Sequence, residues 1–233
     1  MRRNEQSSAK HVAAHGWPAW WALCGWLVAV VLASLGSAFA QASGARDDGT
    51  TALLFGQIGL WTGFIATAVI ASRSFGAGDL RVDFGVIAKP NDAAKAILIG
   101  VALQLLAVPA IYLPIKAIGL DLDVSGPAQS LFADLSRIEA ALIAIGVAVI
   151  APVAEELLFR GVLLRGLSRQ LGPWVGISAS ALLFAATHFQ LVQFPALLLV
   201  GLTLAWLADR TGGLAAPIWA HVGFNATTVA FLW

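Results

Sequence analysis

The chain has 233 residues and a formal net charge of +1, and 59% of its residues are hydrophobic whereas only 12% are charged. Soluble domains average about 45–50% apolar and about 25% charged residues, so this composition excludes an ordinary water-soluble fold. The near-neutral charge excludes a basic nucleic-acid-binding surface, and the single cysteine, Cys24, excludes an intramolecular disulfide.

Apolar runs long enough to cross a bilayer, about 17–25 residues each, recur along the chain. Neither a residue-level repeat nor a Pro- or Ser-rich linker divides it, so we predict one all-helical, polytopic membrane domain, with N-terminal helices over 1–137 and a second group over 138–228. The last two runs are expected to form a tight hairpin at Thr211-Gly212-Gly213. The seven runs interpreted as transmembrane helices are 17–41, 51–72, 93–118, 138–160, 174–192, 195–209 and 213–232.

Lysine and arginine residues predict the orientation, because they are retained on the cytoplasmic side of a membrane. With a cytoplasmic N-terminus, three of the 14 basic residues, Arg46, Lys116 and Arg137, lie on outer segments. We therefore predict a multi-pass protein of the cell membrane with its N-terminus in the cytoplasm and its C-terminus outside. The residues on inner segments are Arg2, Arg3, Lys10, Arg73, Arg81, Lys89, Lys95, Arg160, Arg165, Arg169 and Arg210.

The first run also resembles a signal peptide, since a basic N-terminus and an apolar stretch precede Ala38-Phe39-Ala40. Its apolar part is long and rich in tryptophan, which favours a retained membrane anchor. Cleavage would leave the orientation of the later helices unchanged.

Ionisable residues gather in the fourth run, where a carboxylate is costly and usually faces a protein cavity. Glu156 and Arg160 are four residues apart and share a helix face, so we predict an ion pair between them. Glu155 is rotated by about 100° from Glu156 and is left available, roughly 15 Å below the cytoplasmic boundary. Pro152, one turn earlier, is expected to kink the helix and to make room for water.

Two histidines lie in later runs at a similar depth. Counted from the cytoplasmic ends of their helices, His188 is roughly 21 Å and His221 roughly 12 Å deep. Phe184 precedes His188 by four residues and Asn225 follows His221 by four, so each pair shares a helix face. We predict that both histidines and Glu155 line one cavity that is open to the cytoplasm.

These residue types suit the activation of water. A buried carboxylate can act as general base, imidazoles can orient water or bind a metal, and an amide can stabilise a tetrahedral intermediate. The reaction that this set favours is peptide-bond hydrolysis. The alternative is that the polar groups only bond helix to helix, but their convergence from three helices and the cost of burying two carboxylates favour function.

Three ordered motifs, Glu155-Glu156-x-x-x-Arg160, Phe184-x-x-x-His188 and His221-x-x-x-Asn225, resemble those of the CAAX protease and bacteriocin-processing (CPBP or Abi) family, which includes Rce1-type prenyl-protein endopeptidases. The resemblance covers about residues 138–228, and the three motifs together are far more specific than any one alone. It implies a CAAX prenyl protease-like membrane endopeptidase whose catalytic residues are Glu155, His188, His221 and Asn225, supported by Glu156, Arg160 and Phe184.

The resemblance also implies roles for these residues. Glu155 and His188 would activate water, whereas His221 and Asn225 would hold the oxyanion. The catalytic cavity would lie within the C-terminal helices, and the substrate would be a membrane-associated protein or peptide. The family has been described both as metalloproteases and as glutamate-dependent hydrolases, so a zinc (Zn2+) site formed by His188, His221 and Glu155 stays open. The usual member has eight membrane spans, one more than the seven counted here.

Other classes fit the sequence less well. No His-Glu-x-x-His motif of a zinc-dependent site-2 protease occurs. Gly76-Ala77-Gly78-Asp79 spells the GxGD pattern of intramembrane aspartyl proteases, but its polar surroundings indicate a turn. Two non-protease hypotheses stay open: a membrane scaffold or bacteriocin-immunity factor, in which the cluster serves assembly, and, third, a proton-coupled transporter.

Overall fold

The structure is a computed structural model that describes residues 16–45, 49–120, 122–133 and 135–232. The described residues form helices and no strand, as predicted. Three segments, named η, are π-helical. In chain order the elements are α2 (Trp20–Ala42), α3 (Thr50–Phe75), α4 (Leu80–Phe84), α5 (Pro90–Ala102), η1 (Leu103–Ala107), α6 (Val108–Ala117), α7 (Gly126–Phe132), α8 (Arg137–Ile145), η2 (Gly146–Ile150), α9 (Ala151–Glu156), η3 (Leu157–Leu164), α10 (Arg165–Leu171), α11 (Pro173–Ala186), α12 (Phe194–Thr211) and α13 (Ala215–Leu232).

Five continuous helical runs within the described residues are long and apolar enough to cross a membrane. They confirm the expectation of a multi-pass membrane protein. Of the seven predicted spans, the one at 174–192 corresponds to the shorter α11 and the one at 213–232 to α13, which is not among the five. A count of seven or eight spans is therefore not confirmed. The five runs are Trp20–Ala42, Thr50–Phe75, Pro90–Ala117, Arg137–Leu171 and Phe194–Thr211.

The first two long helices pack closely because small residues line their contact. A Cβ atom added to Gly36 would collide with the carbonyl of Phe55 across the interface, and Ser37 Oγ donates to the carbonyl of Ala52 at 3.0 Å. Small residues permit close helix approach in a membrane. At the start of α2, Trp17 Nε1 donates to the carbonyl of Val162 at 2.9 Å, which ties the first span to the helix that carries Glu155.

The run Arg137–Leu171 is one long helix that begins at a capping box, in which Ser136 and Glu139 bond to each other's backbone N–H groups. The helix continues past residue 160, where the predicted run ended, to the arginines of α10. The structure places the π-helical turn η2 directly before Pro152, where the sequence predicted a kink. Proline lacks the N–H that a regular helix requires, and π-helical turns recur at functional sites.

One prediction about the fifth run is wrong. Helix α11 ends at Ala186, so His188 lies in the connection to α12 rather than within a helix that continues to residue 192. Thr187 Oγ1 caps the end of α11 by donating to the carbonyl of Phe184 at 3.0 Å, and Phe189 adopts a positive φ of 55°. A non-glycine residue in this conformation is uncommon and marks a turn, which the apolar composition of the run did not reveal.

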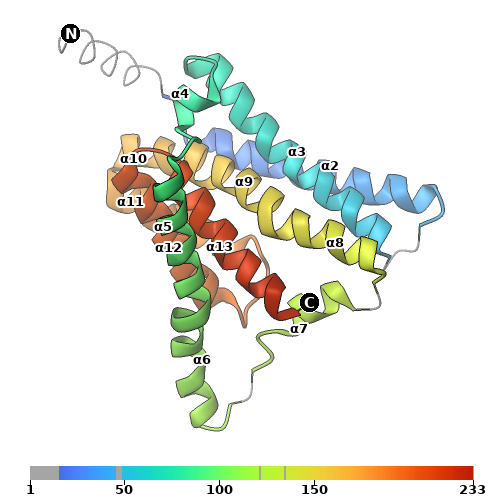
Figure 1. The fold of residues 1–233 in the computed structure, drawn as a ribbon. Helices are drawn as coiled ribbons and strands as arrows, with labels where there is room; N and C mark the ends of the chain where they lie inside the picture. The colour runs from blue at the N-terminus through green and yellow to red at the C-terminus, as the bar shows by residue number, and fades with distance from the viewer. Residues whose placement is uncertain (1–15, 46–48, 121, 134, 233) are drawn as a thin grey trace.

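The helices converge around α4 and α10 and diverge toward α6 and α8 (Figure 1). The main core lies where they converge and includes the fully buried Phe84, Val162 and Leu214. The predicted hairpin between α12 and α13 is confirmed, since α12 ends at Thr211 and Gly212 adopts a left-handed φ of 69°. In the loop Gly76–Asp79, Asp79 caps α4 by accepting from the Arg81 N–H at 2.8 Å, which supports the interpretation of the GxGD pattern as a turn.

Candidate active site

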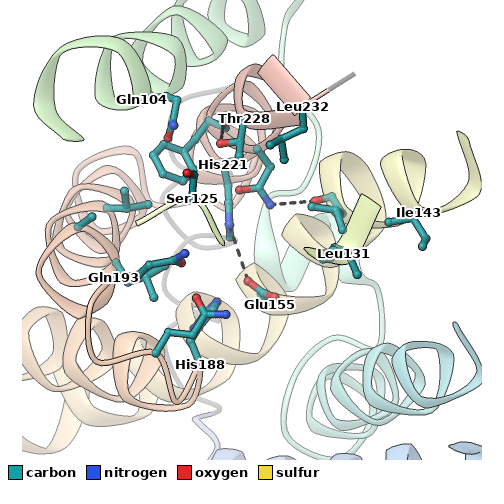
Figure 2. A pocket seen from close by; sticks show the side chains of 18 of the residues that line it. Gln104, Ser125, Leu131, Ile143, Glu155, His188, Gln193, His221, Thr228 and Leu232 are labelled. Atoms are coloured by element: carbon teal, nitrogen blue, oxygen red, sulfur yellow. Dashed lines mark hydrogen bonds and ion pairs between the residues drawn. The ribbon is translucent and has the colours of Figure 1, made fainter. Parts of the chain in front are cut away.

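A cavity of about 530 Å³ lies where the helices diverge, and it contains all four predicted catalytic side chains (Figure 2). Its volume is in the range of ligand-binding pockets, about 300–1,000 Å³. The sequence placed such a cavity within the C-terminal helices alone. In the structure its walls also include Leu53, Gln57 and Trp61 of α3 and Gln104 of η1, so the N-terminal helices help to form it.

The two adjacent glutamates occupy different environments. The Glu155 side chain lines the cavity and is 16% exposed, whereas that of Glu156 is completely buried. Glu156 Oε1 accepts from Arg160 Nη1 at 2.7 Å, which confirms the predicted ion pair. The rotation of about 100° between neighbouring helical residues thus produces one paired and one accessible carboxylate.

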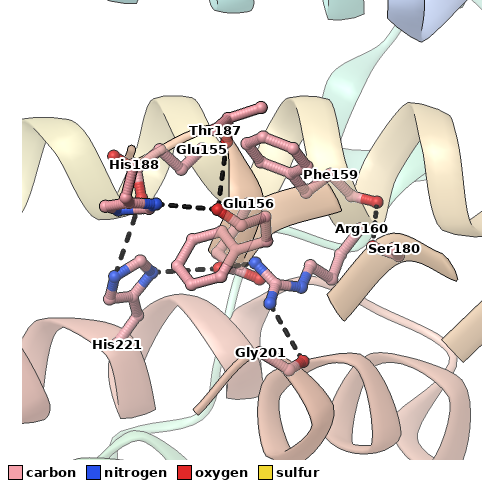
Figure 3. Close-up of polar contacts among 10 residues, drawn as sticks. Glu155, Glu156, Phe159, Arg160, Ser180, Thr187, His188, Gly201 and His221 are labelled. Carbon is pink, nitrogen blue, oxygen red and sulfur yellow. Dashed lines mark hydrogen bonds and ion pairs between the residues drawn. The ribbon is translucent and has the colours of Figure 1, made fainter. Parts of the chain in front are cut away.

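Arg160 is fully buried, and its contacts join the helix that carries Glu156 to α12 (Figure 3). Its Nη2 donates to the carbonyl of Gly201 in α12 at 3.0 Å, and its Cζ lies 4.4 Å from the centre of the Phe184 ring. A Cβ atom at position 201 would press on the Ala181 backbone and the Phe184 ring, so glycine allows α12 to approach this closely. A buried arginine needs such partners because its desolvation is costly.

His221 connects the two glutamates, a relation that no sequence spacing predicts. Its Nδ1 lies 3.0 Å from Glu156 Oε1, and its Nε2 lies 3.8 Å from Glu155 Oε2. Because a carboxylate only accepts, Nδ1 carries the proton of the first contact, and Nε2 is the acceptor when the ring is neutral. Its position on the cavity wall lets Nε2 exchange a proton with Glu155.

His188 lines the same cavity from the connection after α11. Its Nδ1 lies 2.7 Å from the carbonyl oxygen of Phe184. The carbonyl only accepts, so Nδ1 donates and the neutral ring keeps Nε2 as its acceptor. The Phe184 ring separates the two histidines, with centroids 4.8 Å from His188 and 5.6 Å from His221. Phe184 is thus an apolar part of the cavity wall beside both histidines.

Asn225 lies on the cavity wall, but its amide already has a partner. Its Nδ2 donates to the carbonyl of Val147 at 2.8 Å. In the π-helical turn the Ala151 N–H bonds the carbonyl of Gly146, five residues back. The same register would pair the carbonyl of Val147 with Pro152, which has no N–H. Asn225 therefore satisfies an acceptor that proline leaves open, and one amide hydrogen remains for a ligand.

Sequence reasoning missed part of the cavity wall. The glutamine side chains of Gln57, Gln104, Gln190 and Gln193 contribute neutral amides to it, from α3, η1 and the segment between α11 and α12. These residues are far apart in the sequence and belong to no motif, so only their convergence in the fold reveals them.

The candidate ligands of the alternative zinc site are the side chains of His188, His221 and Glu155. Among the described residues no group of three or more His, Cys, Asp or Glu side chains is arranged to hold a metal ion. His221 directs Nδ1 to Glu156 and His188 directs Nδ1 to a backbone carbonyl. These contacts leave Nε2 of both rings available, as metal-binding histidines do, but in the described structure the three side chains are not grouped to hold a metal ion.

Comparison with known proteins agrees with the three motifs. Residues 137–227 match the family model described as Type II CAAX prenyl endopeptidase Rce1-like. An Escherichia coli protein described as an uncharacterized 24.3 kDa protein is 36% identical over 107 residues, which cover 44% of this chain and 48% of that protein. The match thus spans about half the length of the curated relative, and no solved structure matches. The matched residues 137–227 contain all three motifs, so the family model supports the Rce1-like assignment that the motifs predicted.

Proposed function

We propose that this member of the Rce1-like family is a membrane endopeptidase of the CAAX prenyl protease type, in which Glu155 activates water to cleave a peptide bond. The observation that carries the proposal is the contrast between neighbouring carboxylates. Glu156 is buried and paired with Arg160, whereas Glu155 lines a cavity that it shares with His188 and His221. A carboxylate kept accessible at this depth is a candidate general base.

In the proposed reaction Glu155 takes a proton from water while His188 Nε2 accepts a hydrogen bond from the same water and orients it. The water oxygen bonds to the substrate carbonyl carbon and forms a tetrahedral oxyanion. The proton then passes from Glu155 to the leaving nitrogen and the C–N bond breaks. The carboxylic acid that forms gives its proton to the amine, so a carboxylate and an ammonium group are released.

His221 and Asn225 are assigned to the oxyanion, beside Glu155. His221 Nε2 donates to the oxyanion while it holds the proton that it exchanges with Glu155. The free amide hydrogen of Asn225 supports this role, since its other hydrogen bonds the Val147 carbonyl and holds the group in place. Glu156 Oε1 likewise fixes the orientation of the His221 ring. Arg160 acts through Glu156 and is a positioning residue.

The proposed substrate is a membrane-associated protein or peptide, because the cavity lies among apolar helices and is lined mostly by apolar side chains. Glu155→Gln tests the proposal, since glutamine preserves the shape of the side chain but removes the base. Glu139→Gln is the matched control: Glu139 lies on the same long helix, outside the cavity, and glutamine can keep its capping interaction.

The measurement compares peptide termini of membrane proteins from cells that express each variant at equal, folded levels. Termini present with the wild type and Glu139→Gln but absent with Glu155→Gln would support proteolysis and identify substrates. Identical termini in all three cells, with any cellular phenotype retained, would reject the protease and favour the membrane scaffold.

A further inference from the structure

The basic residues and the cavity lie at opposite ends of the bundle. Around α4, α10 and the turn between α12 and α13 lie most of the described exposed or partly exposed lysines and arginines: Arg73, Arg81, Lys89, Lys95, Arg165, Arg169 and Arg210. At the other end, where α6 ends and α8 begins, the described residues include Lys116 and Arg137. By the positive-inside rule the first end faces the cytoplasm. Arg2, Arg3, Lys10 and Arg46 lie outside the described residues.

The cavity opens toward the end that is poor in basic residues. Its exposed lining residues are Leu53 near the start of α3, Ser125 just before α7 and Phe231 near the end of α13. Helices α3 and α13 have their opposite termini at the basic end, where α3 reaches Arg73 and α13 follows Gly212 (Figure 1). The interior lining residues Trp61, Phe184 and His221 are buried.

The basic end is closed. Arg165 donates to the carbonyls of Asp83, Phe84 and Gly212, which joins α10 to α4 and to the turn before α13. The backbone N–H of Leu214 adds a bond to the Phe84 carbonyl at 2.8 Å. Phe84 and Leu214 are fully buried there. A substrate from the basic side would have to displace this packed layer to reach Glu155.

The charge of the lining indicates what the cavity accepts. Among its described lining residues Glu155 is the only one of the Asp, Glu, Lys and Arg types. The amides of Gln57, Gln104 and Gln193 can both donate and accept hydrogen bonds. Such groups complement the N–H and C=O groups of a peptide main chain without requiring a charged side chain.

We propose that the substrate enters from the extracytoplasmic side, as an uncharged peptide segment of a membrane or exported protein. This inference rests on the proposed endopeptidase function. It differs from the expectation that the cavity opens to the cytoplasm, because that expectation and the predicted cytoplasmic N-terminus do not fit together once the cavity is located. The orientation follows from the basic residues, and the location of the opening from the fold.

Two single-cysteine variants, made in a Cys24→Ser background, test the orientation. Ser125→Cys reports on the mouth of the cavity, and Gln170→Cys, exposed beside Arg169, reports on the basic end. In spheroplasts a membrane-impermeant maleimide should label position 125 at once and position 170 only after permeabilisation. The reverse pattern, or equal labelling of both before permeabilisation, would overturn the proposal.

The positions of the cut sites that depend on Glu155 provide a second test of the direction of substrate entry. Cut sites on extracytoplasmic segments with uncharged flanks are expected, and maleimide bound at Ser125→Cys should reduce cleavage at least about tenfold while modification at Gln170→Cys does not. Cut sites on cytoplasmic segments would overturn the direction of entry and leave the protease intact. If no terminus depends on Glu155, the protease fails, and the labelling pattern alone decides which side the mouth faces.

Discussion

At the end of the bundle formed by α4, α10 and the α12–α13 turn, charged side chains bond to backbone groups. In the cavity, by contrast, ionisable side chains have atoms that are left to bond a ligand. Arg165 binds three carbonyls, and Asp83 accepts from Ser72 Oγ and from the backbone N–H groups of Ala77 and Gly78. Glu155, by contrast, has His221 Nε2 at 3.8 Å, beyond direct hydrogen-bond distance. The first arrangement stabilises a closed end, and the second leaves room for water and substrate.

Glu156 and Arg160 lie between the closed end and the cavity, and they connect the two regions. Both are fully buried like the closed end, yet Glu156 holds His221, which faces the cavity. Glu156 Oε2 and Arg160 Nε have no hydrogen-bond partner among the described residues, so the pair is only partly satisfied there. Changes here should therefore affect stability, whereas changes on the cavity wall should affect the reaction.

The largest effect is expected from Arg160→Gln. It leaves the Glu156 carboxylate buried without its cation, and removing one partner of a buried ion pair typically costs about 3–5 kcal/mol. The free energy of unfolding in detergent measures the loss. Arg73→Gln, at an exposed arginine, is the control and should change stability by less than about 0.5 kcal/mol.

The double variant Glu156→Gln with Arg160→Gln sharpens this test. Because it removes both charges, it should recover part of the stability that Arg160→Gln loses. A double variant no more stable than Arg160→Gln would mean that packing of the arginine, and not its charge, supports the fold.

His188→Ala should separate activity from stability. Loss of a group that orients the attacking water should slow cleavage by about 100-fold, equal to about 2.7 kcal/mol of transition-state stabilisation. The unfolding free energy should change little, since His188 lines an open cavity. The rate is measured on a substrate found by the termini comparison, with Leu191→Ala, 90% exposed in the same connection, as the control. An unchanged rate would remove His188 from the mechanism.

Asn225→Leu should cost about 1–3 kcal/mol of stability, because it leaves the Val147 carbonyl without a donor at the cavity wall. Pro152→Ala restores a backbone N–H in the π-helical turn. The cost of Asn225→Leu should therefore be smaller in the Pro152→Ala background, which a double-mutant cycle of unfolding free energies measures. Additive costs would show that proline and asparagine act independently.

The smallest effect is expected from chelation. Purified protein treated with a strong zinc chelator should keep its cleavage rate, because the described His, Cys, Asp and Glu residues form no group able to hold a metal. A known zinc protease in the same detergent should lose its activity and serves as the control. Loss of cleavage followed by recovery with added Zn²⁺ would instead support the alternative site at His188, His221 and Glu155.

Much of the fold could be predicted because membrane helices are encoded locally. Long apolar runs gave the helices over Trp20–Ala42, Thr50–Phe75 and Arg137–Leu171 to within a few residues, apart from the long C-terminal extension of the third. The end of α11 could not be predicted in this way. It depends on the turn at Thr187–Phe189, whose residues are apolar enough to continue a span.

In the site, too, contacts within one helix could be predicted and contacts between distant helices could not. Glu156–Arg160 was predictable because both partners lie on one helix, four residues apart. The bonds from His221 to Glu156 and from Asn225 to Val147 join residues 65 and 78 positions apart, and no local pattern encodes them.

The sequence by itself determined a helical membrane protein, the three motifs that resemble the Rce1-like family and the residues that gather at one site, because helix periodicity, hydrophobicity and motif spacing act over a few turns. The tertiary structure alone decided that His221 contacts Glu156, which N-terminal helices enclose the cavity and at which end it opens. These depend on how helices distant in the sequence pack and diverge, and burial follows from that packing rather than from any single helix.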